Sequence, residues 1–454
     1  MLYDLIVIGG GPAGYLAAER AGHAGLNTLL IEKRTVGGVC LNEGCIPSKT
    51  LLYSAKMYDN ARHSEKYGVV SENVSFNHGK VVDRKNKVVK TLVAGVKGQL
   101  KKNNVTIVEG LGEISGRSND GYEVKVGNES YIGRRLLIAT GSMPVIPPIL
   151  GVKEGIEKGY VLTNREILDL KEVPKNLVIV GGGVIGLEMA SYFNSAGSKV
   201  TIVEMLDHIA GNNDKEISTL LMKNYEKKGI IFKLSSKVTE VKEGTVAYEF
   251  NGESNSVEAD KILMSIGRRP VTQNLGLEKI GVETERGSIK TDNKGQTNVP
   301  GVYAAGDVNG HSMLAHTAYR EAEVCINNII GKKDIMRYNA IPYVIYTNPE
   351  VAGVGETGES AKQKGMDVEV ANVSLRYSGR YLAENEGGDG ICKILVEKNS
   401  RRLVGVHMIS NYSSEIIYGA AVMIEMEMRV EDIKEIVFPH PTVSEIIREG
   451  IFFF

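Results

Sequence analysis

Two cysteines five residues apart are the side chains best suited to redox chemistry. Cys40 and Cys45 lie in the glycine-rich stretch CLNEGC, and residues 46–52 are expected to begin a helix. On a regular helix, residues at this spacing lie about 140° apart around the axis and about 7.5 Å apart along it. Because that geometry is poor for a disulfide, a bonded pair requires an irregular segment, for which Gly44 supplies backbone freedom. A thiolate at a helix N-terminus is stabilised by unpaired N–H groups and is therefore reactive.

The same pair has two other interpretations, either two unrelated buried thiols or half of a zinc site. Zinc would need two more ligands, yet Cys325 and Cys392 have no partner at the usual metal-ligand spacing, so no metal site is expected. Both of these cysteines are expected to be buried, inert thiols. Four cysteines are also too few for a secreted fold held by disulfides. We therefore favour a redox-active disulfide.

The cysteine pair directly follows the first of two matching segments, which are offset by 172 residues. Residues 5–33 read LIVIGGGPAGYLAAERAGHAGLNTLLIEK, and residues 177–205 read LVIVGGGVIGLEMASYFNSAGSKVTIVEM. Each segment has an apolar run, a G-x-G-x-x-G turn, a helical stretch and a second apolar run that ends in glutamate. The motif residues are Gly9, Gly11, Gly14 and Glu32 in the first copy, and Gly181, Gly183, Gly186 and Glu204 in the second.

This pattern is typical of a unit that binds a dinucleotide. The first glycine allows a tight turn, the second lets the pyrophosphate approach the backbone, and the third lets the helix pack on the strand. The helix N-terminus attracts the phosphates, and the glutamate binds a ribose hydroxyl. Two copies therefore predict two bound dinucleotides. At the second site Glu204 would repel the 2′-phosphate of NADP, and residues 205–214 contain no Arg or Lys, which favours NAD.

Three further apolar runs end in glycine turns. Residues 136–141 (LLIATG) and 262–267 (ILMSIG) are each interpreted as the strand that closes its nucleotide domain. Residues 302–307 (VYAAGD) form a third such strand, which ends in an acid. Asp307 is either the N-cap of a helix or a carboxylate that contacts a cofactor polyol.

Composition narrows the class of protein. The 454 residues imply about three domains. A net charge of −1 argues against a nucleic-acid binder, and no apolar run approaches the ~20 residues that would cross a membrane. The N-terminus has no basic stretch before its first apolar segment, so no cleaved signal is expected and we predict a cytoplasmic protein.

Paired G-x-G-x-x-G units with C-x-x-x-x-C between them resemble the FAD-dependent pyridine nucleotide–disulfide oxidoreductases. Residues 37–49 (GGVCLNEGCIPSK) are close to the active-site signature of that family. Residues 313–316 (MLAH), 341–350 (IPYVIYTNPE) and 440–445 (HPTVSE) look like the members that act on lipoyl groups. The resemblance runs from about residue 3 to residue 449.

The resemblance implies two cofactor sites. FAD would be bound by the first repeat together with Lys49, its partner Glu188, and Gly112, Thr140, Asp307 and Ala315. NAD would be bound by the second repeat together with Val238 and Gly267. The implied fold is α/β, with two Rossmann-like dinucleotide-binding domains and a C-terminal α/β interface domain. We expect an FAD domain at 1–143, an NAD domain at 144–270, a central segment at 271–335 that completes the FAD domain, and the interface domain at 336–454.

The resemblance also implies the reaction and the partners. Protein-bound dihydrolipoamide would be oxidised to lipoamide and NAD+ reduced to NADH, with Cys40 exchanging with substrate and Cys45 facing the flavin. His440 would be the general base, oriented by Glu445 and supplied by the second subunit of a homodimer. The partners would be the lipoyl-bearing carriers of 2-oxoacid dehydrogenase or glycine cleavage complexes. Another disulfide reductase, for glutathione or coenzyme A disulfide, and a non-catalytic flavoprotein are the alternatives.

The histidine assignment has a competing interpretation. Residues 442–445 (TVSE) fit a capping box at the start of the final helix, so Glu445 could be only a cap and His440 an ordinary loop residue. His311 and His316 are rival bases. Oxidation of a dithiol must release protons, and imidazole is the side chain suited to accept them near pH 7. The family match places His440 first.

Overall fold

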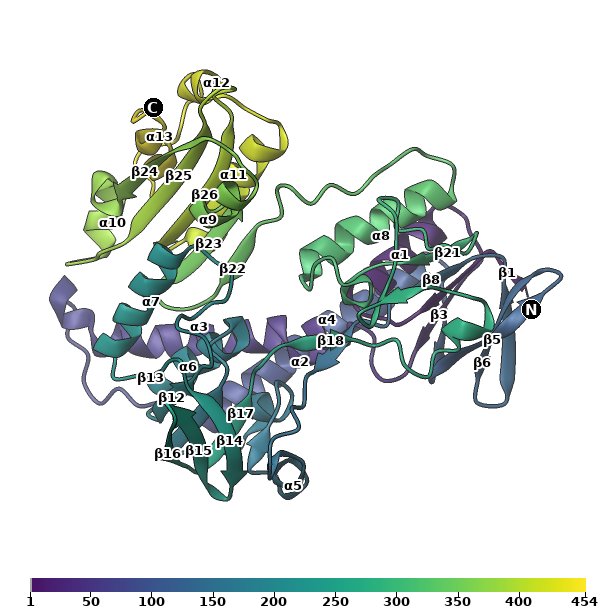
Figure 1. Ribbon diagram of the computed structural model, residues 1–454, viewed down its shortest axis with the longest axis horizontal. Coiled ribbons are helices and arrows are strands. Elements are labelled where there is room, and N and C mark those ends of the chain that lie inside the picture. The colour runs from purple at the N-terminus through teal and green to yellow at the C-terminus, as the bar shows by residue number, and fades with distance from the viewer. Residues whose placement is uncertain (1) are drawn as a thin grey trace. The chain divides into compact units, whose positions relative to one another are not determined.

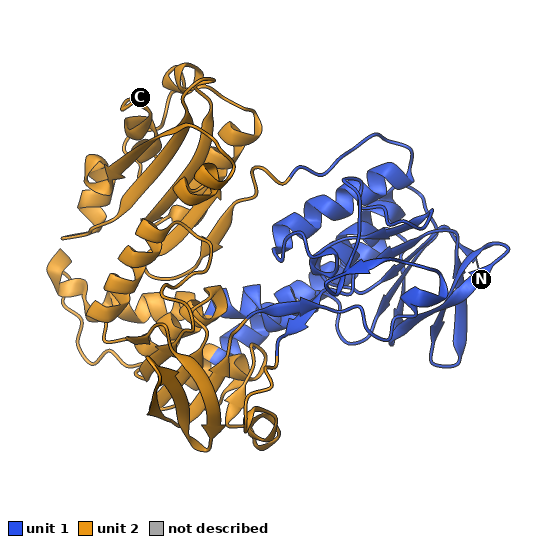
Figure 2. Ribbon diagram, viewed as in Figure 1, with its two compact units in different colours: residues 1–50, 82–145, 267–337 blue, residues 51–81, 146–266, 338–454 orange. Residues whose placement is uncertain are grey.

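The computed structural model describes residues 2–454, which divide between two units built from interleaved segments of the chain (Figure 2). Unit 1 contains the residues up to Thr50 together with Val82–Val145 and Gly267–Arg337. Unit 2 contains Leu51–Val81, Ile146–Ile266 and Tyr338–Phe454. No helix of residues 2–454 is long and apolar enough to cross a membrane.

The first repeat forms the middle of a five-stranded parallel sheet in unit 1. Its strand order is β21 (Val302–Ala304), β8 (Leu136–Ile138), β2 (Leu5–Ile8), β3 (Thr28–Glu32) and β4 (Thr106–Glu109). Because successive side chains of a strand point to opposite faces, the side chains of β2 contribute to two separate hydrophobic cores. Leu5 and Val7 pack with helices α1 (Pro12–His23) and α8 (Ala315–Ile329). Ile6 and Ile8 pack with a second sheet, ordered β1 (Leu2–Tyr3), β7 (Glu129–Gly133), β6 (Gly121–Val126) and β5 (Gly112–Ser118).

The second repeat builds the same architecture in unit 2 (Figure 1). Its parallel sheet is ordered β10 (Val161–Leu162), β17 (Lys261–Met264), β11 (Asn176–Val180), β12 (Lys199–Val203) and β13 (Ile231–Lys233). Helices α6 (Val184–Ser195) and α7 (Lys215–Lys227) follow β11 and β12. A small antiparallel sheet contains β14 (Lys237–Lys242), β15 (Gly244–Phe250) and β16 (Glu253–Ala259).

The two strands expected to close the nucleotide domains each pair with the first strand of their repeat and lie inside their sheet. β8 pairs with β2, and β17 pairs with β11. The edges beyond them are β21 and β10. The two-residue strand β10 is too short to show in the sequence as a periodic pattern.

The last part of unit 2 is a five-stranded antiparallel sheet, called the interface sheet below. Its order is β22 (Tyr343–Ile345), β23 (Glu350–Gly355), β26 (Leu403–Ser410), β25 (Ile391–Glu397) and β24 (Val368–Ser374). Its apolar residues pack with α11 (Ser413–Glu425), α12 (Val430–Lys434) and α13 (Glu445–Ile451). The expected α/β class with two dinucleotide-type sheets and a C-terminal α/β part is confirmed.

The remaining helices and strands connect these sheets. The helices are α2 (Gly38–Glu43), α3 (Cys45–Arg62), α4 (His78–Lys102), α5 (Val152–Lys158), α9 (Gly358–Gln363) and α10 (Gly379–Glu384). The strands are β9 (Ser142–Pro144), β18 (Arg268–Pro270), β19 (Thr284–Glu285) and β20 (Ser288–Ile289). β9 pairs with β18, and β19 pairs with β20.

Candidate active site

Cys40 and Cys45 are joined by a disulfide, with their Cα atoms 4.6 Å apart. Cys40 lies in α2, whereas Cys45 is the first residue of α3. The break between the two helices falls at Gly44, so the irregular segment anticipated from the sequence is confirmed. Because the two sulfurs are bonded to each other, neither is available as a zinc ligand. Cys325 and Cys392 are buried free thiols, as expected.

The first glycine turn is packed too closely to accept side chains at Gly9 and Gly14. Gly9 has a φ of +104°, and a Cβ added there would lie 2.3 Å from the carbonyl oxygen of Ala139. A Cβ on Gly14 would lie 1.7 Å from the carbonyl oxygen of Gly9, which is the close helix–strand contact that the motif predicts. Gly11 is the N-cap of the 12-residue helix α1 and brings no side chain to cover its first N–H groups. These features fit a pyrophosphate at the helix N-terminus.

Glu32 is fixed at the end of β3 by two backbone donors. The Gly10 N–H donates to its Oε2 at 2.7 Å, and the Arg34 N–H donates to its Oε1 at 2.8 Å. The side chain is only 8% exposed, but each carboxylate oxygen keeps a second lone pair for a ligand hydroxyl. The carboxylate is therefore held beside the glycine turn, where the ribose of an FAD adenosine is expected.

The second glycine turn repeats this geometry. A Cβ on Gly181 would lie 2.4 Å from the carbonyl oxygen of Ser265, and a Cβ on Gly186 would lie 2.4 Å from that of Gly181. Glu204 accepts the Gly182 N–H at 2.6 Å and the Leu206 N–H at 2.8 Å. Gly183 is the N-cap of α6. The two predicted dinucleotide sites thus share one hydrogen-bond arrangement.

The disulfide lies next to the first glycine turn. The Gly37 N–H donates to the carbonyl of Gly10 at 2.7 Å. A Cβ on Gly38, the first residue of α2, would lie 2.5 Å from the Cα of Gly11. The helix that carries Cys40 therefore begins in backbone contact with the turn expected to bind the FAD pyrophosphate.

Of the other residues of the expected FAD set, Thr140 follows a strand of the same sheet, whereas Gly112, Ala315 and Lys49 lie on other elements. Thr140 comes after β8, and its hydroxyl donates to the carbonyl of Val271 at 2.6 Å. Gly112 begins β5, where an added Cβ would lie 3.2 Å from Ile31. Ala315 is the first residue of α8, and Lys49 lies on α3. Carboxyl ends of adjacent parallel strands meet at one edge, which is where ligands bind in such sheets.

Asp307 follows β21 and is not the N-cap of the short helix that begins there, because Gly306 holds that position. Its Oδ2 instead accepts a hydrogen bond from the hydroxyl of Ser142. Nε of Arg268 donates to Ser142 Oγ at 2.8 Å. Burial lowers the pKa of Arg268, although the charge of Asp307 opposes this. Sequence reasoning missed Ser142 and Arg268, which meet only because β9 pairs with β18.

The remaining expected cofactor residues divide between the units. Glu188 lies on α6, is 3% exposed, and accepts the Tyr346 N–H at 3.0 Å. Val238 lies buried in β14. Gly267 follows β17 with a φ of +115° and belongs to unit 1. Lys49 also belongs to unit 1 whereas Glu188 belongs to unit 2, so their pairing stays a prediction.

His440 is held by Glu445, with 2.8 Å between Nδ1 and Oε1. The other carboxylate oxygen accepts the Thr442 N–H at 2.8 Å. Burial opposes ionisation of Glu445, but these two hydrogen bonds together lower its pKa below the ordinary value. The capping box is incomplete, because α13 begins at Glu445 and the Thr442 hydroxyl donates to the carbonyl of Pro439. Glu445 therefore makes both the hydrogen bond to His440 expected of an orienting acid and the backbone hydrogen bond to Thr442 expected of a cap.

The rival histidines lie elsewhere in the fold. His311 precedes α8, and its Nε2 is 3.2 Å from the Thr291 hydroxyl. His316 is the second residue of α8. By contrast, the His440 side chain is 78% exposed, so its ring is open to a partner from outside this chain.

Known proteins share both the sequence and the fold. A family profile described as pyridine nucleotide-disulphide oxidoreductase matches residues 3–322, and the dimerisation domain of the same family matches residues 341–451. The mitochondrial dihydrolipoyl dehydrogenase of Pisum sativum is 40% identical over 98% of this chain and 90% of its own.

The matches to two solved structures each cover 99% of this chain and 99% of the chain in the solved structure. LpdA from Mycobacterium tuberculosis has a TM-score of 0.90 at 26% identity, and the HOCl-induced flavoprotein disulfide reductase RclA from Escherichia coli has 0.87 at 27%. FAD and NAD, the two dinucleotides implied by the sequence, are the cofactors of this group. The chain therefore belongs to the pyridine nucleotide-disulphide oxidoreductases.

Proposed function

We propose that this enzyme oxidises protein-bound dihydrolipoyl groups and reduces NAD+, with the Cys40–Cys45 disulfide as the electron acceptor for substrate. The observation that carries this proposal is that the disulfide joins α2 to the first residue of α3, while α2 begins in backbone contact with the first glycine turn. The identity to a dihydrolipoyl dehydrogenase supports the lipoyl substrate.

The first half of the reaction is thiol–disulfide exchange. One dihydrolipoyl thiolate attacks Sγ of Cys40, the bond to Cys45 breaks, and the Cys45 sulfur leaves as a thiolate. The second lipoyl sulfur attacks the first, which releases the Cys40 thiolate and the oxidised lipoyl disulfide. The N–H groups at the start of the 18-residue helix α3 favour the negative charge on Cys45. FAD held by the first repeat would supply the two-electron chemistry that links the reduced cysteines to hydride transfer to NAD+.

His440 is proposed as the base that deprotonates the dihydrolipoyl thiol. Its Nδ1 faces Glu445, so Nε2 is the nitrogen that accepts the proton, and the nearby carboxylate stabilises the resulting imidazolium. We place this histidine in the active site of a second copy of the chain. The match to a dimerisation domain over residues 341–451 supports that homodimer.

The cofactors are assigned to the two repeats. Gly9, Gly11, Gly14 and Glu32 hold FAD, and Asp307, oriented by Ser142, contributes a carboxylate at the same edge of the sheet. Gly181, Gly183, Gly186 and Glu204 hold NAD. The four segments 1–143, 144–270, 271–335 and 336–454 remain our division of the chain. The gap between the two family matches supports the boundary near 336.

The proposed partners are the lipoyl-bearing carrier proteins of 2-oxoacid dehydrogenase or glycine cleavage complexes. These proteins carry the lipoyl group in covalently bound form, and free dihydrolipoamide corresponds only to that group. A cytoplasmic location is proposed as well. The low cysteine count supports a reducing compartment, although the pea relative is named as mitochondrial.

Steady-state turnover of the purified, FAD-loaded protein tests the proposed substrate. The measurement pairs NAD+ with dihydrolipoamide in the oxidative direction. In the reductive direction it pairs NADH or NADPH with lipoamide, glutathione disulfide or coenzyme A disulfide. The proposal predicts fast NAD+-linked oxidation of dihydrolipoamide with parallel lines in the double-reciprocal plot, and weak activity with NADPH. Strong activity on another disulfide with weak lipoyl turnover would overturn the substrate.

A further inference from the structure

A row of side chains crosses all five strands of the interface sheet. Asn372 on β24, Lys393 on β25, His407 on β26, Gly353 on β23 and Tyr343 on β22 are successive cross-strand partners. Because directly opposed residues point to the same face of a sheet, their side chains lie side by side. Four of the five positions are polar, on a sheet whose other side chains are mainly apolar.

The row meets the first turn of α7. Nζ of Lys393 lies 2.9 Å from Oδ2 of Asp214 and 3.5 Å from Oε2 of Glu216. Nδ2 of Asn372 donates to the same Glu216 oxygen at 3.0 Å. The Asp214 side chain is fully buried and that of Lys393 is 14% exposed, so this ion pair is shielded from water. A buried pair depends strongly on both partners, because removal of one leaves an uncompensated charge.

At the other end of the row, His407 is buried beside Gly353 and Tyr343. His407 is fully buried, and its Nε2 donates to the carbonyl of Glu356 at 2.8 Å, while the Tyr343 hydroxyl lies 3.2 Å from Nδ1. A Cβ on Gly353 would lie 2.4 Å from Nδ1 of His407 and 2.6 Å from the Tyr343 ring. The row therefore requires glycine at this position.

Asp214 also ends the loop that begins at Glu204, the acid of the second glycine repeat. As the N-cap of α7, its Oδ1 accepts the N–H groups of Glu216 and Ile217 at 3.1 and 3.3 Å. Within the loop, the Ala210 N–H donates to the carbonyl of Gly182 at 2.9 Å. The Gly182 N–H in turn donates to Glu204. Lys393 is thus connected to the second glycine turn, where NAD is assigned. Lys393 contacts Asp214, the loop before Asp214 contacts Gly182, and Gly182 contacts Glu204.

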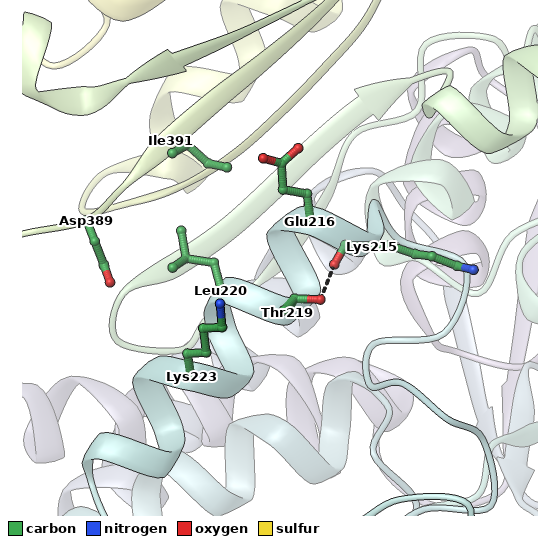
Figure 3. A pocket seen from close by; sticks show the side chains of 7 residues that line it. All are labelled: Lys215, Glu216, Thr219, Leu220, Lys223, Asp389 and Ile391. Atoms are coloured by element: carbon green, nitrogen blue, oxygen red, sulfur yellow. Dashed lines mark hydrogen bonds between the residues drawn. The ribbon is translucent and has the colours of Figure 1, made fainter.

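The same side of α7 borders a pocket. Figure 3 shows this pocket, which is lined on α7 by Lys215, Glu216, Thr219, Leu220 and Lys223 and across from the helix by Asp389 and Ile391. At the far end of the helix, Nζ of Lys227 lies 3.1 Å from Oδ2 of Asp389, with the lysine side chain 68% exposed. Two lysines, Lys393 and Lys227, therefore make ion pairs that join α7 to this part of the chain, and only those of Lys393 adjoin the loop from Glu204 to α7.

We propose that Lys393 is a positioning residue for NAD, which holds Asp214 and thereby fixes the loop from Glu204 to α7. The inference rests on the proposed assignment of NAD to the second repeat. Without Lys393, the Asp214 carboxylate must take up a proton or turn toward water, because an unpaired buried charge is costly. Either response displaces the first turn of α7 and the loop that ends there.

NAD+ binding to the oxidised, FAD-loaded protein, followed by calorimetry, tests this role for Lys393→Met. We expect Kd to rise on the order of tenfold, about the effect of 1.4 kcal/mol, with KM for NAD+ rising in parallel and KM for dihydrolipoamide unchanged. Lys393→Arg retains the charge and should restore most of the affinity. The matched control is Lys227→Met, which removes the exposed ion pair of the same helix and should leave Kd within twofold.

A second variant separates positioning from stability. Asp214→Asn combined with Lys393→Met removes both charges and keeps a good N-cap, so no unpaired buried charge remains and most of the NAD+ affinity should return. Unchanged NAD+ affinity in Lys393→Met, or equally weak NAD+ binding in the double variant, would overturn the positioning role whatever the change in Tm. If wild-type protein bound no NAD+, or if Glu204→Ala left its affinity unchanged, the NAD assignment itself would fail.

Discussion

His440 and Glu445 form a hydrogen-bonded pair across the start of the last helix, with Nδ1 and Oε1 2.8 Å apart. The second oxygen of the same carboxylate accepts the Thr442 N–H, so the acid is fixed by the backbone that carries the histidine. One side chain thus sets both the local turn and the orientation of the imidazole. This arrangement suits a base that must present Nε2 to a substrate thiol.

Glu445→Gln should lower kcat for dihydrolipoamide oxidation by about 10- to 100-fold. The amide oxygen can still accept one N–H, but glutamine carries no charge to stabilise the imidazolium. Steady-state kinetics would measure the loss, and folding would be checked by Tm. Glu449→Gln, which removes a surface partner of Arg448 on the same helix, is the control and should retain full activity. Equal activity of both variants would argue that Glu445 serves only the turn.

Thiol titration should distinguish the paired cysteines from the buried ones. Burial raises the pKa of Cys392 to about 12 and raises that of Cys325 still further, so neither forms thiolate near pH 8. A disulfide reagent should find no reactive thiol in the native oxidised protein and two after reduction with NADH. Unfolded, reduced protein should give all four. A reactive thiol in the native oxidised state would contradict the disulfide or the burial.

The third glycine of each repeat offers a test of the two nucleotide sites. Gly186→Ala should abolish NADH binding and leave FAD bound, because the new Cβ would displace Gly181 and the second turn only. Gly14→Ala should cost FAD occupancy, which the visible spectrum and released flavin would report. Gly98→Ala, in open space on α4, is the control and should stabilise the fold by about 0.5–1 kcal/mol. Loss of FAD in Gly186→Ala would contradict these assignments and indicate that the second repeat, rather than the first, binds FAD.

Glu204 should determine the choice between NAD and NADP. Glu204→Gln removes the negative charge but keeps an oxygen for the Gly182 or Leu206 N–H. We expect KM for NAD+ to rise about tenfold and the preference for NAD+ over NADP+ to fall, because the repulsion of the 2′-phosphate is gone. The ratio of kcat/KM for the two nucleotides measures the effect. A ratio equal to that of the wild type would show that another group excludes NADP.

The sequence predicts features that are local or repeated. The glycine turns, the closing glutamates and the break at Gly44 depend on residues within about 25 positions, and the structure has each of them. Contacts between distant strands were missed. Ser142 and Arg268 meet through a two-stranded sheet, and Lys393 meets Asp214 across 179 residues. No periodic pattern marks such pairs, because each depends on how separate elements pack.

The choice between the two interpretations of Asp307 and the strand order of the two parallel sheets show the same limit. An acid after a glycine turn fits a cap, but Gly306 takes that place and the carboxylate meets the Ser142 hydroxyl instead. Strand order within a parallel sheet depends on crossovers, which the order of strands along the chain does not fix. The domain boundaries, the Lys49–Glu188 pair and the supply of His440 by a second copy stay predictions.

NAD+-linked oxidation of dihydrolipoamide by Cys45→Ser, compared with the wild type, tests the central claim most directly. The variant removes one half of the disulfide and leaves the FAD turn intact, so flavin should stay bound at one per chain. We predict turnover at background, while Cys392→Ala, which alters a buried thiol outside the proposed site, retains it. Substantial lipoamide activity in Cys45→Ser with FAD bound would contradict a reaction through the Cys40–Cys45 disulfide.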